Sequence, residues 1–331
     1  MCSSDLSRAS AIGPERRTSR SRARTRSTAT RSRSRKVTAS RVPATAPAQQ
    51  KGAPVAPPPG PDDPTKLQGA PTSAVGTRST FVSASRSPVG EVTGSSLTPL
   101  QDLTGTITPA DLHFERHHAG IPRIDPARHR LTIHGLVERP LVFTVDEIKR
   151  FPQVTRTYFV ECSGNGRGAY RDPKPELTAQ KVAGLTAQSE WTGTPLKALF
   201  AEVGVTPTAK WFLAEGGDAC VMTRSIPVEK AMDDALIVWA QNGEPLRPEQ
   251  GFPLRLLLPG WEGNTNVKWL RRLELGTEPW MTRWETSKYT DPLPDGTARR
   301  FSFDMDAKSI ITAPSFPQAI TKGWWSVGGI A

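Results

Sequence analysis

Alternating apolar and polar positions predict a chain with many short strands and few helices. Strands are predicted at HRLTIHG (129–135), LVFT (141–144), RTYFVEC (156–162, as a buried strand), KWFLAEG (210–216), ALIVWAQNGEPL (235–246), FPLRLLLPGW (252–261) and NVKWLRRLEL (266–275). Within 235–246, Asn242-Gly243 is a strong hairpin signal. Helices are predicted at 145–151, from Pro195 with Thr194 as its cap, and at 226–232 with Pro227 in the first position.

Short helices scattered among many strands indicate an α+β (mixed α/β) fold, not a doubly wound parallel sheet. No GxGxxG motif opens a helix and no Walker lysine motif is present in the sequence. These two observations disfavour dinucleotide and nucleotide binding. No stretch approaches the ~20 apolar residues of a membrane span, and no apolar signal-peptide region follows the first basic residues.

The first 95 residues differ in composition from the rest of the chain. They are rich in Arg, Ser, Thr, Ala and Pro, as in TSRSRARTRSTATRSRSRKV, and are expected to be a disordered tail. The net charge of the whole chain is +11, and residues 1–41 hold eleven Arg and one Lys against one Asp and one Glu. The remainder is therefore nearly neutral, and nucleic-acid binding is an open alternative for the tail alone.

Cys162 stands in YFVECSGNGRGAY, where a strand runs into a glycine-rich loop. A reactive thiolate, a metal ligand and an inert core thiol are the three open interpretations. Arg167, five residues on, would lower the pKa of a nearby thiol. The chain has three cysteines, so no disulfide framework is indicated, although a bridge from Cys162 to Cys220 is one alternative.

All five histidines lie between His113 and His134, and HFERHH is compatible with a zinc site. No CxxC pair accompanies them, which disfavours zinc. Arg116 and His118 together are suited to holding an anion. Arg255 and Lys268 are isolated cations in apolar strands, and such a cation either reaches solvent or meets an anion.

Six segments in a fixed order resemble the molybdopterin domain of the sulfite oxidase family: DLHFERHHAGIPRIDP, ECSGNGRG, EWTGTPL, NGEPL, QGFPLRLLLPGWEGNTNVKWLRRLEL and ETSKYTD. TPLQDLTGTITPADLHFERHHAG and MDAKSIIT are similar to its sulfane dehydrogenase (SoxC-type) branch. The resemblance covers residue 96 to the end. It implies a sulfite-oxidase-type molybdopterin fold over 96–309 and the start of a truncated immunoglobulin-like dimerisation domain at 310–331.

The resemblance also implies a molybdenum-molybdopterin (Mo-MPT) cofactor, with Cys162 as the metal ligand. The positions that match the cofactor contacts of the family are Phe114, His118, Cys162, Asp218, Gln250, Arg255, Asn266, Val267 and Lys268. Those that match its catalytic residues are Tyr289, Arg116 and Arg167.

The activity that the resemblance implies is oxidation of sulfur by oxygen-atom transfer, on the sulfane sulfur of a carrier-bound persulfide or thiosulfonate. Sulfite dehydrogenase is the alternative within the class, beside a methionine-sulfoxide reductase relative. The electron acceptor is expected to be a c-type cytochrome, since the sequence has no CxxCH haem site. A sulfur-carrier protein is the expected substrate partner and the periplasm the expected location, and relatives are homodimers.

Two positions depart from typical sulfite oxidases. Gln250 stands in place of a histidine, and Gly166 in place of an arginine. A less cationic pocket suits a bulkier substrate than free sulfite.

Overall fold

The computed structural model describes residues 67–170 and 177–331. All the helices and strands described lie in one compact unit, Gly76–Ala331. The Arg-rich segment 1–41 and the rest of the expected tail up to residue 66 lie outside the described residues.

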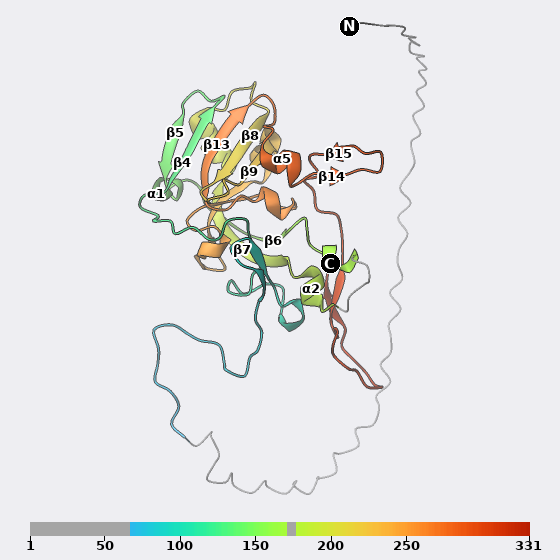
Figure 1. Cartoon of the computed structure of the whole chain (residues 1–331). Coiled ribbons are helices and arrows are strands. Elements are labelled where there is room, and N and C mark those ends of the chain that lie inside the picture. Colours follow the sequence, from blue (N-terminus) through green and yellow to red (C-terminus); the bar gives the residue numbers. More distant parts are fainter. Residues whose placement is uncertain (1–66, 171–176) are drawn as a thin grey trace, which may run out of the picture. The chain divides into compact units, whose positions relative to one another are not determined.

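Short strands dominate this unit, as the sequence pattern predicts (Figure 1). The strands are β1 Ser87–Gly90, β2 Gly94–Leu97, β3 Glu115–His117, β4 Arg130–Gly135, β5 Leu141–Thr144, β6 Val154–Glu161, β7 Thr186–Pro195, β8 Trp211–Gly216, β9 Thr223–Pro227, β10 Leu236–Gln241, β11 Glu244–Pro245, β12 Arg255–Leu257, β13 Leu270–Gly276, β14 Asp291–Pro292, β15 Ala298–Arg299, β16 Ile310–Ala313 and β17 Gly328–Ile330. The α-helices are α1 Val145–Ile148, α2 Ala179–Ala183, α3 Leu196–Val203, α4 Val228–Asp233 and α5 Arg283–Ser287. The 3-10 helices are η2 Leu100–Asp102, η3 Arg167–Tyr170, η4 Pro248–Gln250 and η5 Gly263–Thr265.

One five-stranded sheet has the order β5-β4-β13-β8-β9. Strands β4 and β13 are parallel, with Ile133 opposite Leu273, and the other neighbours are antiparallel. In β4, Leu131 and Ile133 are fully buried while Arg130 is exposed, which is the period-2 pattern of a sheet with one covered face. The predicted strands 129–135, 141–144 and 210–216 are thus confirmed.

A second sheet has the order β11-β10-β7-β6, with β12 also paired to β10. The β10–β11 connection is the predicted Asn242-Gly243 hairpin, and both residues have positive φ, 51° and 77°. Backbone of this hand matches the twist of the flanking strands, which is why Asn-Gly is favoured there. The hairpin prediction is confirmed.

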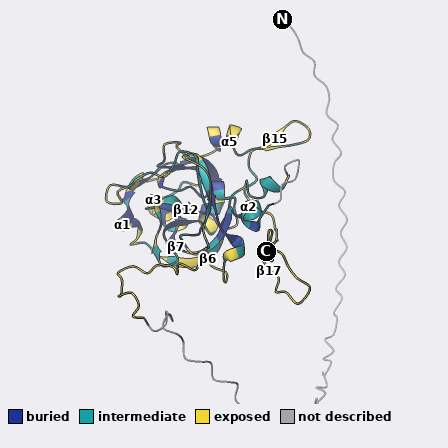
Figure 2. Ribbon diagram, turned by 60° about the horizontal axis from the view of Figure 1, so that its bottom comes forward, coloured by how far each residue is buried: buried dark blue, intermediate teal, exposed yellow. Residues whose placement is uncertain are grey.

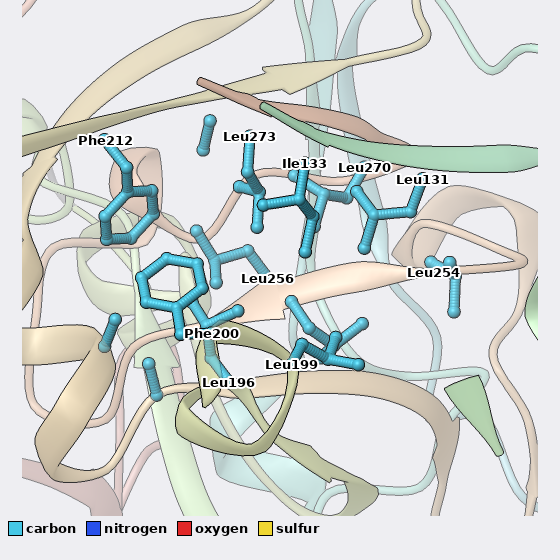
Figure 3. Packing of buried hydrophobic residues seen from close by; sticks show 14 of the residues in the cluster. Leu131, Ile133, Leu196, Leu199, Phe200, Phe212, Leu254, Leu256, Leu270 and Leu273 are labelled. Atoms are coloured by element: carbon cyan, nitrogen blue, oxygen red, sulfur yellow. The ribbon is translucent and has the colours of Figure 1, made fainter. Parts of the chain in front are cut away.

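The larger hydrophobic core includes residues of β4, β12, β13 and helix α3 (Figure 3). Leu196, Leu199, Phe200 and Val203 of α3 are almost completely buried, and their i, i+3, i+4, i+7 spacing puts them on one helix face. Figure 2 shows the same burial as dark blue ribbon in the middle of the sheets. This core fixes the strands whose ends carry the site.

Three local expectations were wrong. β6 is buried only at its end, at Val160 and Glu161, because most of the strand faces solvent on both sides. Thr194 does not cap α3, since its hydroxyl donates to Ile148 O within the core (3.1 Å) and Pro195 is the N-cap without a side-chain bond. Helix α4 begins at Val228, with Pro227 as its N-cap instead of its first residue.

The first and last strands lie near the expected domain boundaries. β1 and the start of β2 fall inside 1–95, the expected tail, and β2 pairs with β3, so regular structure begins before residue 96. β16 and β17 form an antiparallel hairpin at the C-terminal end. Assignment of 310–331 to an immunoglobulin-like domain stays a prediction.

Candidate active site

Eleven of the twelve predicted site residues line one cavity. They are Phe114, Arg116, His118, Cys162, Asp218, Gln250, Arg255, Asn266, Val267, Lys268 and Tyr289. Other lining residues include Glu115, His117, Met222, Asn264 and Trp269. The contributing segments come from β3, the end of β6, the β8–β9 connection, η4, β12, η5 and the segment after α5. Residues up to 175 positions apart in sequence therefore meet at one place.

The loop after β6 presents Cys162 to the cavity and is held by Asn165. The Asn165 amide nitrogen donates to Glu161 Oε1 (2.8 Å) and Ala183 O (3.0 Å), and its oxygen accepts from the Leu185 amide (3.1 Å). The Cys162 amide itself donates to Leu185 O (3.0 Å). The thiol is thus carried by backbone fixed on both sides.

Space for this loop depends on glycines. Gly166 has φ +83°, a conformation that L side chains rarely adopt. A side chain at Gly263 would come within 2.6 Å of Glu161 O, so η5 can approach the end of β6 only without one. Burial raises the pKa of the Cys162 thiol, and the nearby Arg116 charge acts in the opposite direction. The thiolate is the form that binds metal, and a bound metal ion stabilises it.

A hydrogen-bonded chain of charged groups forms one wall. Lys268 Nζ donates to Arg116 O (3.0 Å), Glu249 O (2.9 Å) and His117 Nδ1 (2.9 Å). His117 Nε2 in turn lies 2.7 Å from Glu115 Oε2. Since Nδ1 accepts from the ammonium, Nε2 carries the His117 proton and donates to the carboxylate. Burial lowers the pKa of Lys268 to about 7.

Arg255 forms the other cationic part of this wall. It is 4% exposed, and its Nη1 donates to Gln250 O (3.3 Å) and Oε1 (3.1 Å). The Gln250 amide nitrogen donates to Phe114 O (2.7 Å), so Gln250 connects β12 to the segment before β3. Burial lowers the pKa of Arg255 to about 10, and the guanidinium lies 5.1 Å from the Trp191 ring centroid.

A negatively charged group bound at this wall would stabilise it. Among residues 67–170 and 177–331, Arg255 and Lys268 have no carboxylate within 4.0 Å, and the buried Arg255 Nε has no hydrogen-bond partner. Burying such groups costs several kcal/mol unless an anion or acceptor pairs with them. A phosphate-bearing pterin at this wall, with its metal at Cys162, fits the donors that are present.

Tyr289, from the segment after α5, and His118, which directly follows β3, meet in the cavity lining. The Tyr289 hydroxyl lies 2.7 Å from His118 Nε2, and the His118 ring packs on Trp284 with centroids 4.7 Å apart. Burial, with the Arg116 charge, lowers the pKa of His118 to about 4, so its imidazole is neutral at pH 7. Burial likewise raises the pKa of the Tyr289 phenol. Both side chains are therefore neutral at pH 7, and a proton can move along the hydrogen bond between them.

Asp218 and Asn266 serve structure as well as lining the cavity. Asp218 accepts from Cys220 Sγ (2.7 Å) and the Met222 amide (3.1 Å), which fixes the β8–β9 turn. Asn266 Oδ1 accepts from the Leu258 amide (2.7 Å). Some of the hydrogen-bonding atoms of both side chains are therefore already bonded within the protein.

Arg167 is not brought to the cavity. It is the first residue of η3, and its side chain is exposed. Its Cδ nevertheless lies near the loop of the thiol, because a Cβ at Gly164 would be 3.7 Å from Arg167 Cδ and 3.8 Å from Cys162 Sγ. Arg116 is thus the one predicted substrate arginine that lines the cavity in the described parts of the chain.

Sequence reasoning missed several residues at this site. His117 and Glu115 were passed over in favour of His118, and Arg224 and Glu285 form a buried ion pair behind Tyr289. Arg224 carried no sequence signal, because its neighbours Thr223 and Ser225 are polar, whereas Arg255 stands between two leucines.

The other interpretations of these residues find no support here. Cys162 and Cys220 are both free thiols. Within 67–170 and 177–331, no three His, Cys, Asp or Glu side chains are grouped as a zinc site held by protein side chains would require. Across the same residues, none of the helices combines the length and apolar character needed to cross a bilayer.

Comparison with known proteins gives the same picture. Residues 118–284 match the family described as "Oxidoreductase molybdopterin binding domain". The crystal structure of the sulfane dehydrogenase SoxCD from Paracoccus pantotrophus is similar to this chain, with a TM-score of 0.70 and 44% identity, over 76% of this chain and 68% of that one.

Nitrate reductases are also similar. The NADH enzyme of Ulva prolifera is 37% identical over 185 residues, 52% of this chain and 21% of that protein. The NADPH enzyme of Phytophthora infestans is 31% identical over 238 residues, 69% of this chain and 24% of that protein. The chain thus spans less than a quarter of the length of these curated relatives.

These matches agree with the wall of buried cations, the single cavity cysteine and the sheet order. The cofactor of the site is Mo-MPT, and the chain belongs to the oxidoreductase molybdopterin-binding domain family, of sulfite oxidase type.

Proposed function

We propose that this protein oxidises sulfur with Mo-MPT, acting on the sulfane sulfur of a carrier-bound persulfide or thiosulfonate. Electrons would leave to a c-type cytochrome, and the reaction would take place in the periplasm. Similarity to the sulfane dehydrogenase SoxCD at 44% identity supports this substrate class over nitrate, since the nitrate reductases are 31–37% identical.

The observation that carries the proposal is the composition of one cavity. Cys162 lies in it together with Arg116, His118 and Tyr289, and the buried cations line its wall. Cys162 would hold the molybdenum, and Arg255 and Lys268 would pair with the pterin phosphate. When bound, the cofactor supplies two-electron oxidation coupled to transfer of an oxygen atom that originates in water.

Adding one oxygen atom to sulfur consumes one water and releases two protons and two electrons. Arg116 would bind the anionic sulfur group, because only its Nη1 is occupied, by Gly94 O (3.2 Å) and His117 O, among the described residues. Such a charge-assisted contact contributes about 1.5–3 kcal/mol. Tyr289 would take a proton from the reacting site and pass it to His118 Nε2, 2.7 Å away.

Free sulfite is the alternative substrate. Gln250 is neutral where typical sulfite oxidases have a histidine, and exposed Arg167 adds no charge inside the cavity. With Arg255 and Lys268 paired to the pterin phosphate, Arg116 would be the one lining arginine left for the substrate among the described residues, which favours a substrate that is also held elsewhere, as a carrier protein would be. Turnover of a carrier-bound persulfide should exceed that of free sulfite, and fast turnover of sulfite alone would make sulfite dehydrogenase the function.

The decisive test is metal content. Cys162→Ser should reduce bound molybdenum from near one per chain to near zero, measured by elemental mass spectrometry on purified, folded protein. Cys220→Ser is the matched control, because Cys220 contacts Asp218 and does not line the cavity, and it should keep its molybdenum. Unchanged molybdenum in Cys162→Ser would refute the assignment of the metal ligand.

A further inference from the structure

Arg224 of β9 is a buried cation that the proposed reaction does not yet use. Its side chain is 1% exposed, and its Nε and Nη1 have no hydrogen-bond partner within residues 67–170 and 177–331. Burial lowers the pKa of Arg224 while Glu285 raises it, and a guanidinium in a protein stays protonated at neutral pH. A buried charge in this position destabilises the protein unless another group compensates for it.

Glu285 and Tyr289 face the guanidinium, and the charge of Glu262 also acts on it. Glu285 Oε1 lies 3.7 Å from Arg224 Nε, and this carboxylate is completely buried. The Tyr289 ring lies on another side, with its centroid 5.1 Å from the Arg224 Cζ. Arg224 therefore links a buried carboxylate to the face of the aromatic ring whose hydroxyl reaches the cavity.

The carboxylate is itself fixed to the backbone of β9. Glu285 Oε1 accepts from the Ser225 amide (2.8 Å), and its Oε2 accepts from the Thr282 hydroxyl at the start of α5. Trp284 Nε1 donates to Val221 O (3.2 Å), which docks the same helix beside β9. Arg224 is thus held in one place by groups that have little freedom to move.

The segment after α5 depends on this arrangement. The Tyr289 amide donates to Trp284 O (2.9 Å), so α5 sets where the tyrosine backbone lies. Beyond that bond, the ring is contacted by His118 at its hydroxyl, by Arg224 over its face and by the Trp284 ring, with centroids 6.2 Å apart. Tyr289 lines the cavity and Arg224 does not, and Arg224 lies over the Tyr289 ring, so the ring connects Arg224 to the cavity.

We propose that Arg224, held by Glu285, is a positioning residue that keeps the Tyr289 ring in place with its hydroxyl on His118. This inference rests on the proposed role of Tyr289 in proton transfer. The fixed charge also favours negative charge on the phenol as its proton leaves. Burial opposes such charge most strongly and raises the pKa of Tyr289, whereas Arg116 and Arg224 act in the opposite direction.

The chain has three tyrosines, Tyr158, Tyr170 and Tyr289, which makes the ring observable by itself. With 3-fluorotyrosine incorporated in the full chain, each gives one ¹⁹F resonance, and Tyr→Phe variants assign them. The change of each resonance between H₂O and D₂O reports how far the ring contacts solvent. Tyr170, 90% exposed, is the internal reference.

The variant to compare is Arg224→Met with Glu285→Gln, because removing one partner alone leaves a buried charge unpaired and can unfold the chain. We expect the double variant to raise the solvent isotope shift of Tyr289 toward that of Tyr170, while Tyr158 and Tyr170 keep theirs. Arg224→Lys keeps the charge without the planar guanidinium and should move Tyr289 less. A folded double variant with an unchanged Tyr289 signal would overturn the proposal.

Kinetics of the cofactor-loaded enzyme give the second measurement. Loss of ring position should lower kcat about 10- to 100-fold with KM within about twofold, since a misplaced catalytic group affects the chemical step. A fall in kcat without any change at Tyr289 would overturn positioning in favour of a direct role. If Tyr289 moves but the loaded wild type oxidises no sulfur compound, positioning stands and the proposed function fails.

The matched control is the exposed pair Arg139 and Glu202, 3.4 Å apart on the surface. Arg139→Met with Glu202→Gln removes the same kinds of side chain and should leave all three tyrosine signals and kcat unchanged. A change at Tyr289 in this control as large as that in the Arg224 double variant would also overturn the proposal.

Discussion

Lys268 destabilises the cofactor-free protein and would stabilise the cofactor-bound one. Its ammonium gives three hydrogen bonds, to two carbonyl oxygens and one imidazole nitrogen, and none of these acceptors is charged. The pKa of Lys268 falls to about 7, first because of burial and then because of Arg255. A bound phosphate would reverse this penalty, since it supplies the missing negative charge.

The pH dependence of the cofactor-free protein should show this penalty. The folded pKa of Lys268, about 7, lies below its ordinary value of 10.5. Between these values the unfolded chain binds more protons, so the free energy of unfolding rises with pH. We expect a gain of about 1–2 kcal/mol from pH 7 to pH 9, measured by urea denaturation, after a discount for water in the open cavity.

Lys268→Met should flatten this slope, because the methionine has no proton to lose. Lys230→Met is the control and should keep it, since Lys230 pairs with Asp234 at 2.8 Å on α4, outside the cavity lining. An equal slope in the wild type and in Lys268→Met would contradict the assignment.

Arg116 and Arg167 make a second prediction at the residue scale. Arg116 lines the cavity and Arg167 is exposed on η3. Arg116→Met should lower kcat/KM for an anionic sulfur substrate by about 10- to 100-fold, which corresponds to one charge-assisted contact. Arg167→Met should stay within about twofold, as an exposed substitution does. Equal losses in steady-state assays would mean that Arg167 moves into the cavity during turnover.

At the scale of elements, the loop after β6 connects fold and chemistry. Lys308, from the segment before β16, donates to Glu161 Oε1 (2.6 Å), the same atom that accepts from Asn165. The loop that carries Cys162 is therefore tied to the C-terminal segment as well as to Ala183 and Leu185 on the other side.

Asn165→Ala should loosen this loop without removing the thiol. The substitution leaves Ala183 O and the Leu185 amide without their side-chain partner, at a cost of about 1–3 kcal/mol for each buried group. We expect faster alkylation of Cys162 by iodoacetamide in the cofactor-free protein and a lower molybdenum content. Peptide mass spectrometry at Cys162 gives the rate.

Asn242→Ala is the matched control for this loop. Asn242 also bridges two segments, accepting from the Glu190 amide (2.9 Å) and donating to Thr108 O (2.8 Å), but it lies in the β10–β11 hairpin. It should lower stability by a comparable amount while Cys162 alkylates at the wild-type rate. Equally fast alkylation in both variants would show general loosening instead of a local effect.

The elements also show what the sequence can and cannot reveal. Strand β4 was predictable because its residues alternate into a core, β8 because it is a short, mostly buried apolar run, and the β10–β11 turn because Asn-Gly favours positive φ. β3 is three residues long and carries Glu115, Arg116 and His117, so no apolar pattern marks it. The exposure of most of β6 and the position of the Arg167 side chain outside the cavity depend on tertiary contacts, which the spacing of apolar residues in the sequence does not reveal.

The cavity residues were predictable for a different reason. All twelve predicted site residues came from the resemblance to a known family, and eleven of them line the cavity, although they lie far apart in sequence and the spacing of apolar residues does not mark them. Arg224 lies in none of those motifs and Glu285 is the first residue of ETSKYTD, but neither was predicted as a site residue, and only their burial beside Tyr289 reveals them. The assigned roles of all these residues remain proposals that the variants above test.

At the scale of the whole molecule, charge is divided unevenly along the chain. Of 43 basic and 32 acidic residues, twelve basic and two acidic ones lie in residues 1–41, which leaves the rest of the chain with a net charge of about +1. Polyanion binding by the whole chain should therefore come from this segment, whatever the cavity does.

Deletion of residues 1–41 tests whether polyanion binding and molybdenum binding are separate properties of the chain. RNA binding is the alternative for the tail, and any binding of single-stranded RNA by the full chain should weaken about 10³-fold between about 50 and about 200 mM salt, because bound phosphates release counterions. The deletion variant should lose this binding and keep its molybdenum content, since the cavity lies wholly within Gly76–Ala331. Salt-sensitive RNA binding that survives the deletion would place a cationic surface on the folded unit. A loss of molybdenum in the deletion variant would mean instead that loading of the cofactor requires residues 1–41.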